Sequence, residues 1–290
     1  MTFRSDIGVI DLMIGFPFVD KHAVYDYLYA VIKDDQSKEA QFPVGYMFKD
    51  TPEELGDHDP IDYTFSRMNT HNISAGLFSI SGIALEARRK FPNRVFLSLE
   101  IDPNDITGTV RKIRNIHAEH GLTAVTTFPA GCNPQVPVSD RRYYPIYQTC
   151  IDLDLPIIAN AGVPGPRVPA ACQHVEHFDQ VCYDFPELRI VMRHGAEPWE
   201  DLAVKLMLKW PGLYYMTSAF APKYFPQAII DYANTRGMDK IMYAGYFPAG
   251  LTIERMFSEL PDVAFRDHVW PHFLRNNAIK VFNLDLTPQE

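Results

Sequence analysis

Short apolar runs alternate with segments of helical periodicity along almost the whole chain. The runs are rich in β-branched and aromatic residues, which is typical of strands buried on both faces. The segments between them space apolar residues three or four positions apart, which indicates amphipathic helices. Strands are predicted at 9–14, 75–81, 95–100, 123–128, 156–161, 188–192, 213–217 and 241–245. Helices are predicted at 21–33, 61–72, 85–91, 106–120, 143–153, 173–183, 202–209, 227–234, 251–260 and 265–282, with no strong element over 34–60.

This alternation predicts parallel pairing of the strands. Eight strand–helix units in a chain of 290 residues are typical of a (β/α)8 barrel. We therefore expect an α/β fold in which residues 1–290 form a single TIM-barrel domain. A doubly wound open sheet is the alternative, but it is expected to carry a glycine-rich phosphate loop after its first strand. The residues found there, Gly15-Phe16-Pro17, do not form such a loop.

The predicted sixth strand carries a histidine at its C-terminal end. Ile190-Val191-Met192 runs into Arg193-His194-Gly195, and Glu197-Pro198-Trp199 then begins a helix. In a parallel barrel, catalytic groups lie at the C-terminal ends of the strands and in the loops that follow. His194 is therefore a candidate catalytic residue, and a histidine that only ends the strand is the alternative. Arg193 alternates with His194 along the strand, so we expect it to be structural.

Composition excludes several classes of partner. The formal net charge is −9 and there is no basic run, so nucleic acid is not expected as a partner. No apolar stretch is long enough to cross a bilayer, and the first residues lack the apolar core of a secretory signal. The four cysteines have no C-x-x-C spacing and are expected to be reduced packing residues. These features favour a cytoplasmic protein with a small-molecule substrate and no membrane partner.

The second half of the chain contains several short motifs, and the spacing between them is part of the pattern that they form. They are His194-Gly195-Ala196-Glu197-Pro198-Trp199, Tyr214-Tyr215-Met216-Thr217-Ser218-Ala219, Tyr232-Ala233-Asn234-Thr235-Arg236-Gly237 with Asp239-Lys240, and Asn277-Ala278. Together with Val9-Ile10-Asp11 and the strand order, they resemble the amidohydrolase-2 family, the group of aminocarboxymuconate-semialdehyde decarboxylase and related decarboxylases and hydrolases. The resemblance implies a barrel enzyme, an acid/base role for His194, and a homodimer.

The resemblance also implies a metal site, and at this point the chain departs from the family. Members usually carry His-x-His on the first strand, a histidine after the fifth and an aspartate after the eighth. Those positions are held here by Met13, Gly15, Asn160 and Tyr246. Zinc is bound by imidazole, thiolate or carboxylate ligands, which this set does not supply. The helical pairs His117/His120 and His174/His177 lack a third partner, so we expect no metal and no cofactor.

His194, Tyr246 and Asp11 are the predicted catalytic residues. His194 titrates near neutral pH and suits proton transfer. The Tyr246 phenol is expected to donate a hydrogen bond or a proton. Asp11 lies two residues before Met13 on the same strand face, so we expect it to pair with His194 and raise its basicity. A buried structural carboxylate is the alternative for Asp11.

Five further residues are predicted to bind the substrate. Asn160 offers an amide that orients a carbonyl group. Arg167, in the proline- and glycine-rich loop after the fifth strand, offers a guanidinium for a carboxylate, and an exposed structural arginine is the alternative. Glu100 ends the third strand and, with Asp102, is also an acid/base candidate. Phe16 and Phe128 indicate an apolar or aromatic substrate body, with core packing as the alternative.

The predicted function is that of a metal-independent hydrolase acting on a small carboxylate, lactone, ester or thioester, with His194 as the general base. Two alternatives stay open. One is a metal-independent decarboxylase or other C–C lyase, in which His194 and Tyr246 shuttle the proton. The other is a non-catalytic binding protein, because a fold does not fix a function.

Overall fold

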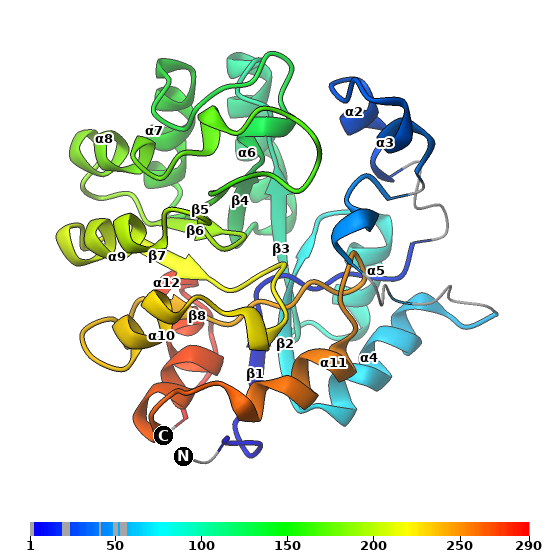
Figure 1. The fold of residues 1–290 in the computed structure, drawn as a ribbon. Helices are drawn as coiled ribbons and strands as arrows, with labels where there is room; N and C mark the ends of the chain where they lie inside the picture. The colour runs from blue at the N-terminus through cyan, green and yellow to red at the C-terminus, as the bar shows by residue number, and fades with distance from the viewer. Residues whose placement is uncertain (1–2, 19–23, 41, 49–51, 53–56, 290) are drawn as a thin grey trace.

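The fold is built on a curled sheet of parallel strands (Figure 1). A computed structural model describes residues 3–18, 24–40, 42–48, 52 and 57–289. Within them, eight strands pair in the order of the chain, from β1 to β8. They are β1 Val9–Asp11, β2 Ile73–Ser79, β3 Val95–Glu100, β4 Ala124–Thr127, β5 Ile157–Asn160, β6 Ile190–Arg193, β7 Leu213–Met216 and β8 Ile241–Met242. The predicted TIM-barrel fold is confirmed, and each strand lies within two residues of its predicted start.

Two apolar cores hold this sheet. The inner core fills the barrel with side chains from alternate positions of the strands, including Ile10, Leu77, Ile158, Val191 and Met242. The outer core lies between the sheet and the helices around it. Because side chains of a strand alternate between the two faces, a strand inside such a barrel is apolar throughout. Polar residues are left to the strand ends, which is where the candidate site lies.

The seam between β8 and β1 differs from the other pairings. These strands form no ladder in the described residues, and β8 is shorter than predicted. A single bridge joins Ile14 to Phe247, and the Gly15 amide donates to the Phe247 carbonyl at 2.9 Å. Asp11 strengthens the seam, because its Oδ1 accepts from the amides of Gly245 at 2.8 Å and Met13 at 3.0 Å.

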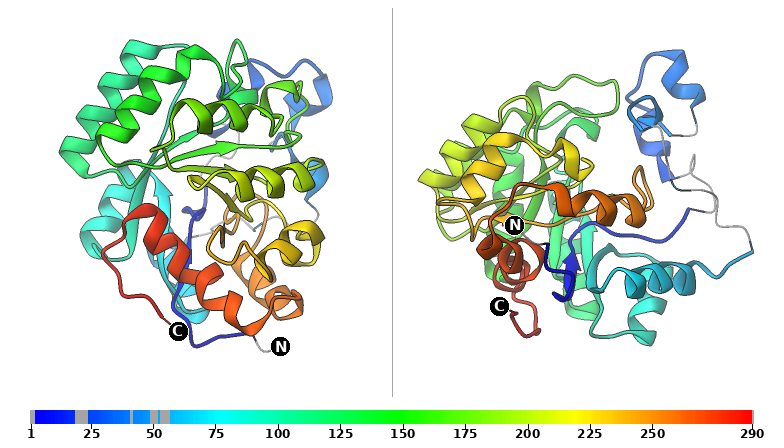
Figure 2. Two further views of the ribbon diagram at one scale, coloured as in Figure 1. Left: turned by 90° about the vertical axis from the view of Figure 1, so that its left-hand side faces the viewer. Right: turned by 60° about the horizontal axis from the view of Figure 1, so that its bottom comes forward.

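Helices follow the strands and surround the sheet (Figures 1 and 2). Side-chain caps begin several of them: Asp59 accepts from the amides of Ile61 and Asp62, and Asp105 accepts from Gly108. Gly121, at φ +63°, ends α6 as predicted. The helices are α4 Pro60–Thr70, α5 Gly82–Lys90, α6 Ile106–His120, α7 Tyr144–Asp152, α8 His177–Asp184, α9 Glu200–Lys209, α10 Gln227–Ala233 and α11 Ile253–Glu259.

The last predicted helix, 265–282, is confirmed over residues 267–282, but the type of helix changes along it. It begins with the 3-10 turn η7 (Asp267–Val269), continues through Trp270 and Pro271 in the α conformation and through the π-helical turn η8 (His272–Asn276), and ends as α12 (Asn277–Phe282). Pro271 has no amide to donate, but it lies near the start of this run, where the missing donor is tolerated. Only the first two predicted residues lie outside the helix.

The chain between β1 and α4 forms a separate feature, which we name the α2–η1 segment (residues 24–40 and 42–48). It contains α2 (Asp26–Tyr29), α3 (Asp35–Glu39) and the turn η1 (Gly45–Met47). Figures 1 and 2 show α2 and α3, in blue, standing apart from the other helices. The predicted helix 21–33 is reduced to α2, and its first residues, 21–23, lie outside the described residues. Within 34–60, where no strong element was expected, Asp34 caps α3 by accepting from the Ser37 amide at 2.9 Å.

Two other expectations concern the whole chain. No helix in the described part of the chain is long and apolar enough to cross a membrane. All four cysteines are buried free thiols, as predicted.

Candidate active site

A cavity of about 1260 Å³ opens at the C-terminal ends of the strands. Its polar side chains come from successive strand ends, and its apolar side chains come largely from β1, β2 and the α2–η1 segment. The polar group includes Ser98, Glu100, Thr126, Asn160, Arg193, His194 and Tyr246. The apolar group includes Met13, Phe16, Leu28, Phe42, Phe48, Phe78 and Phe128. This position agrees with the general placement of active sites in such barrels.

His194 follows β6 directly, at a sharp turn of the backbone. Its φ is +70°, and Gly195 and Ala196 follow at +87° and +60°. A residue with a Cβ pays on the order of 1 kcal/mol for such a conformation. The turn ends the alternation of the strand, and both His194 and the preceding Arg193 line the cavity.

Ser218, which follows β7, fixes the His194 ring. Its Oγ accepts from the His194 backbone amide at 3.2 Å and lies 3.0 Å from Nδ1. Ser218 is fully buried, whereas the His194 side chain is half-buried. Nε2 makes no hydrogen bond within the described residues and is not among their buried unpaired nitrogens, so it borders the cavity.

The surroundings of His194 favour its neutral form. Burial and the adjacent Arg193 cation lower the pKa of His194 well below 6.5, while hydrogen bonding with Ser218 opposes that shift. At neutral pH the ring is therefore an uncharged imidazole. Such a ring accepts a proton at Nε2 when its own proton sits on Nδ1.

Tyr246 lies beside His194, in the loop after β8. The two rings meet edge to face with centroids 5.4 Å apart. Burial raises the pKa of Tyr246 to about 12, and the nearby Arg193 charge partly opposes that rise. The phenol is therefore protonated at neutral pH and available as a donor. Phe48 of the α2–η1 segment contacts its ring, with centroids 5.4 Å apart.

Arg193 corrects one expectation. We expected it to be structural, but it lines the cavity and joins three strand ends. Its Nε donates to Asn160 Oδ1 at 2.6 Å, and its Nη2 lies 3.6 Å from Glu100 Oε2. Asn160 is its register partner on β5. The predicted substrate ligand Asn160 therefore already has its oxygen engaged by a guanidinium.

Glu100 lies on the opposite side of Arg193. Its Oε2 accepts from Thr126, its register partner on β4, at 2.5 Å. Its side chain is 48% exposed, so it is reachable from the cavity. Asp102, two residues on, instead accepts from the Asn104 amide at 2.9 Å and does not line the cavity.

Two predicted residues lie in different surroundings from those we expected. Asp11 was expected to pair with His194, but both of its hydrogen bonds go to backbone amides at the β1–β8 seam, as its alternative interpretation held. Arg167 was expected to meet the substrate. Its Nη1 instead donates to Asp34 at 2.9 Å and Gln36 at 2.8 Å, which ties the loop after β5 to the α2–η1 segment.

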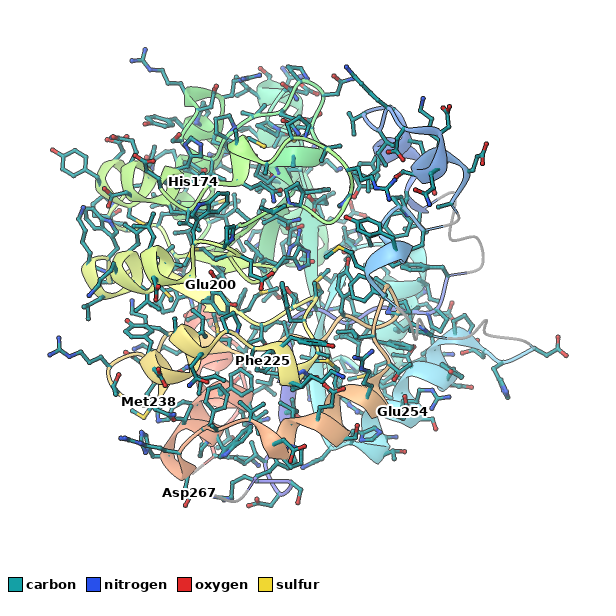
Figure 3. The ribbon with its side chains drawn as sticks, viewed as in Figure 1. His174, Glu200, Phe225, Met238, Glu254 and Asp267 are labelled. Atoms are coloured by element: carbon teal, nitrogen blue, oxygen red, sulfur yellow. The ribbon has the colours of Figure 1, made fainter. Side chains whose placement is uncertain are left out.

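The predicted apolar residues do line the cavity. Phe16 stacks on Phe78 with ring centroids 4.9 Å apart, and Phe128 borders the same space. By contrast, His174, labelled in Figure 3, lies near α8 and packs its ring 4.1 Å from that of Trp199. His177 bonds to Ser139 at 3.0 Å. Both histidines have local contacts and do not line the cavity.

The side chains at the family's metal positions do not fit a metal ion. The Asn160 oxygen is engaged by Arg193, Met13 and Gly15 offer no hard donor, and the Tyr246 phenol is protonated. No group of three or more histidine, cysteine, aspartate or glutamate side chains is placed to hold a metal in the described ranges. The Arg193 guanidinium lies beside Asn160, the residue at the metal position that follows β5 in the family, and its positive charge would repel a metal ion there. No catalytic step is therefore assigned to a metal here.

Sequence reasoning missed several residues of this site, among them Ser218 and Arg193. Ser218 carried a usable signal, because it directly follows a predicted strand in a barrel. Arg193 was excluded by strand alternation, which fails where the backbone turns to positive φ at His194. Tyr25 and Leu28 also line the cavity, but they approach through tertiary packing of the α2–η1 segment.

The fold and site define a class of protein. The amidohydrolase family matches residues 72–284, and the chain belongs to this enzyme family. No curated protein is similar enough in sequence to count as a relative.

Solved structures with the same fold share little sequence with the chain. An uncharacterised TIM-barrel protein from Bordetella bronchiseptica is 18% identical, with a TM-score of 0.75 over 96% of this chain and 99% of that one. The 5-carboxyvanillate decarboxylase from Novosphingobium aromaticivorans, solved with manganese and a nitrobenzoic acid, is 13% identical, with a TM-score of 0.69 over 97% of each chain. A probable 2-pyrone-4,6-dicarboxylic acid hydrolase from Acinetobacter baumannii is 14% identical, with a TM-score of 0.64 over 96% of this chain and 100% of that one.

Proposed function

We propose that this protein is a metal-independent hydrolase that opens a lactone, ester or thioester with His194 as its general base. The observation that carries the proposal is the placement of His194, whose Nδ1 lies 3.0 Å from Ser218 Oγ and whose ring lines the cavity. The lowered pKa of His194 supports it, because a general base acts in its neutral form. Nε2 takes a proton from water, and the resulting hydroxide attacks the carbonyl carbon. The protonated ring then returns the proton to the leaving oxygen or sulfur.

Two neighbours of His194 stabilise the negative charge that develops on the substrate during the reaction. The Tyr246 phenol, protonated at neutral pH, donates a hydrogen bond to the carbonyl oxygen as it becomes an oxyanion. The Arg193 cation favours anionic species in the same cavity. Electrostatic stabilisation of this kind is stronger in apolar surroundings, and apolar residues of the α2–η1 segment line the same cavity.

The substrate body is an apolar ring. Phe16, Phe78 and Phe128 supply flat apolar surface next to the polar groups. The 5-carboxyvanillate decarboxylase and the probable 2-pyrone-4,6-dicarboxylic acid hydrolase described above act, by their names, on rings that carry carboxyl groups. Their fold likeness supports the same class of substrate for this chain.

A second function, decarboxylation, is favoured by one observation. A phenol with a pKa of about 12 is a proton store beside the cavity, and cleavage of a ring–carboxylate bond needs a proton delivered to the ring carbon. In that mechanism Tyr246 protonates the ring carbon, the ring–carboxylate bond breaks and CO2 leaves. The phenolate then takes a proton from solvent water, which His194 relays. Several of the similar structures are decarboxylases by name, which supports this second candidate.

The test is a turnover screen on protein treated with a strong chelator. Aromatic lactones, esters, acyl thioesters and ring carboxylates are offered, and acid release and CO2 release are measured separately. Mass spectrometry of the purified protein is expected to find zinc, iron and manganese far below one ion per chain. Acid release that survives chelation supports the hydrolase. CO2 release alone favours the lyase, and loss of turnover on chelation, restored by a metal, contradicts the proposal.

A further inference from the structure

Arg193 is a buried cation that the protein leaves incompletely paired. The residue is 9% exposed, and its Nε donates to the neutral amide of Asn160 at 2.6 Å. Glu100 Oε2, at 3.6 Å from Nη2, is beyond hydrogen-bond distance and already accepts from Thr126. Within the described residues, a guanidinium with five donors thus makes one hydrogen bond.

The free donors lie on one edge of the guanidinium. Nε and Nη2 form one edge of this planar group, and Asn160 and Glu100 lie along it. Nη1 and Nη2 form the other edge. Side-chain nitrogens buried without a partner in the described residues are those of His71, His117 and Trp270, so the Nη atoms of Arg193 border the cavity. Two parallel N–H groups on such an edge match the two oxygens of a carboxylate.

The other cations of the cavity are differently placed. Lys223 and Arg255 also line it, but both lie near Glu259, at 3.9 Å and 3.0 Å. Arg167, the arginine that the sequence indicated, is bonded to Asp34 and Gln36 outside the cavity. A buried cation without a full partner is costly to the fold, and an anionic ligand would offset that cost.

We propose that the Nη1–Nη2 edge of Arg193 binds a carboxylate of the substrate, so that the substrate is a ring carboxylate with its apolar body against Phe16 and Phe128. This rests on the proposed function for the reaction itself, but the binding step is independent of turnover. The carboxylate ends beside His194, which directly follows Arg193. The reacting bond of the substrate is thereby held close to Nε2 and the Tyr246 phenol.

Calorimetric titration with two small probes tests the proposal at neutral pH. Benzoate carries the carboxylate, and benzamide has the same shape without the charge. The wild-type protein is expected to bind benzoate at least 10-fold more tightly than benzamide. Arg193→Met is expected to weaken benzoate binding by roughly 10- to 100-fold, the range for a charge-assisted pair, while leaving benzamide binding unchanged.

Two further variants keep the result interpretable. Arg193→Lys retains a charge without the paired edge, and it is expected to keep part of the preference for benzoate. Arg255→Met removes another cavity arginine that is already paired with Glu259, and it is expected to keep the full preference. Circular dichroism checks that each variant is folded. If Arg193→Met fails to fold, the comparison of Arg193→Lys with Arg255→Met still decides.

The outcomes separate this proposal from the proposed function. Equal binding of benzoate and benzamide by the wild type overturns the carboxylate site, even if a neutral ester is hydrolysed. An undiminished preference for benzoate in Arg193→Met, or a loss of that preference in Arg255→Met, also overturns it. Binding that depends on Arg193, in a protein that turns over no substrate, supports the site and overturns only the hydrolase.

Discussion

The two walls of the cavity differ in the polarity of their side chains. One wall consists of the ends of β3 to β6 and the loops after β7 and β8, and it carries Glu100, Asn160, Arg193, His194 and Tyr246. The other consists of the ends of β1 and β2 together with the α2–η1 segment, and it is mainly aromatic and aliphatic. We call them the polar wall and the apolar wall. The walls meet where Phe48 contacts Tyr246.

Because of this difference, we expect the two walls to have different roles in the reaction. The apolar wall packs against part of the polar wall, at Tyr246, and burial is the largest cause of both the lowered pKa of His194 and the raised pKa of Tyr246. The polar wall supplies the groups that hold or move charge. Substitutions of His194 and Tyr246 in the polar wall should therefore change kcat, whereas substitutions in the apolar wall, like that of the proposed carboxylate ligand Arg193, should change substrate binding and KM.

The largest effect is expected from His194→Asn. Asparagine is similar in size but cannot exchange a proton near neutral pH, so kcat should fall by roughly 10²- to 10⁴-fold with the melting temperature little changed. Steady-state kinetics on the substrate found by the screen measures this. His268→Asn, at an exposed position in η7, is the matched control. Full activity in a folded His194→Asn protein would move the catalytic base elsewhere in the polar wall, with Glu100 next to be tested.

The pH profile sharpens the same prediction. A base acts in its unprotonated form, and the pKa of His194 is lowered by burial and Arg193. Activity should therefore persist as the pH falls past 6.5 and decline only at lower pH. A wild-type acid limb at or above pH 6.5 would contradict the placement of His194 against the apolar wall.

Tyr246→Phe should have the next largest effect. If the phenol only donates a hydrogen bond to the oxyanion, kcat should fall by roughly 10- to 100-fold. If it protonates carbon in a decarboxylation, the loss should equal that of His194→Asn. The contact between the ring and Phe48 is kept in either case. Tyr183→Phe, at a side chain that is 71% exposed, controls for removal of a phenol. If the Tyr246→Phe variant kept the full kcat, the phenol would have no part in either mechanism.

Phe16→Leu tests the apolar wall. Leucine keeps the apolar character but removes the flat ring that stacks on Phe78. Aromatic contacts contribute about 0.5–1.5 kcal/mol, so KM should rise by roughly 2- to 10-fold while kcat stays near that of the wild type. Phe185→Leu, which removes an aromatic contact with Tyr144 outside the cavity, is the matched control. A fall in kcat with unchanged KM would show that the two walls do not divide the work.

The contrast between the walls also explains what the sequence could predict. Strands and the outer helices follow from apolar periodicity, and the placement of His194 and Tyr246 at the barrel mouth follows from the rule that loops after strands carry function. The hydrolase chemistry and the homodimer stay predictions. The partners of each side chain did not follow from the sequence. Arg167 pairs with Asp34 of the α2–η1 segment, whose position depends on tertiary packing. Arg193 lines the cavity because the backbone turns at His194.

Asp11→Asn should have the smallest effect on activity, and it tests whether Asp11 belongs to the polar wall or only to the seam beside it. Both of its hydrogen bonds are accepted by Oδ1, so asparagine can keep them without a charge. We expect kcat and KM within about 3-fold of the wild type, whereas a partner of His194 would cost far more.

The effect of this substitution should appear in stability instead. Burial raises the pKa of Asp11 to about 6, although the amides of Gly245 and Met13 oppose the rise. The fold therefore favours the protonated carboxyl, whose contribution is complete below the unfolded pKa of about 3.9 and is lost as the pH rises through 6. Asparagine has no such loss, so Asp11→Asn should melt above the wild type at pH 8 and approach it as the pH falls to 4. The free-energy difference between the variant and the wild type at pH 8 is on the order of 2–3 kcal/mol.

Thermal melts between pH 4 and pH 8 measure this difference, with Asp57→Asn as the exposed control. A variant that melts lower at every pH would contradict the stability argument from the raised pKa of Asp11. A variant that loses activity as His194→Asn does would return Asp11 to the catalytic group.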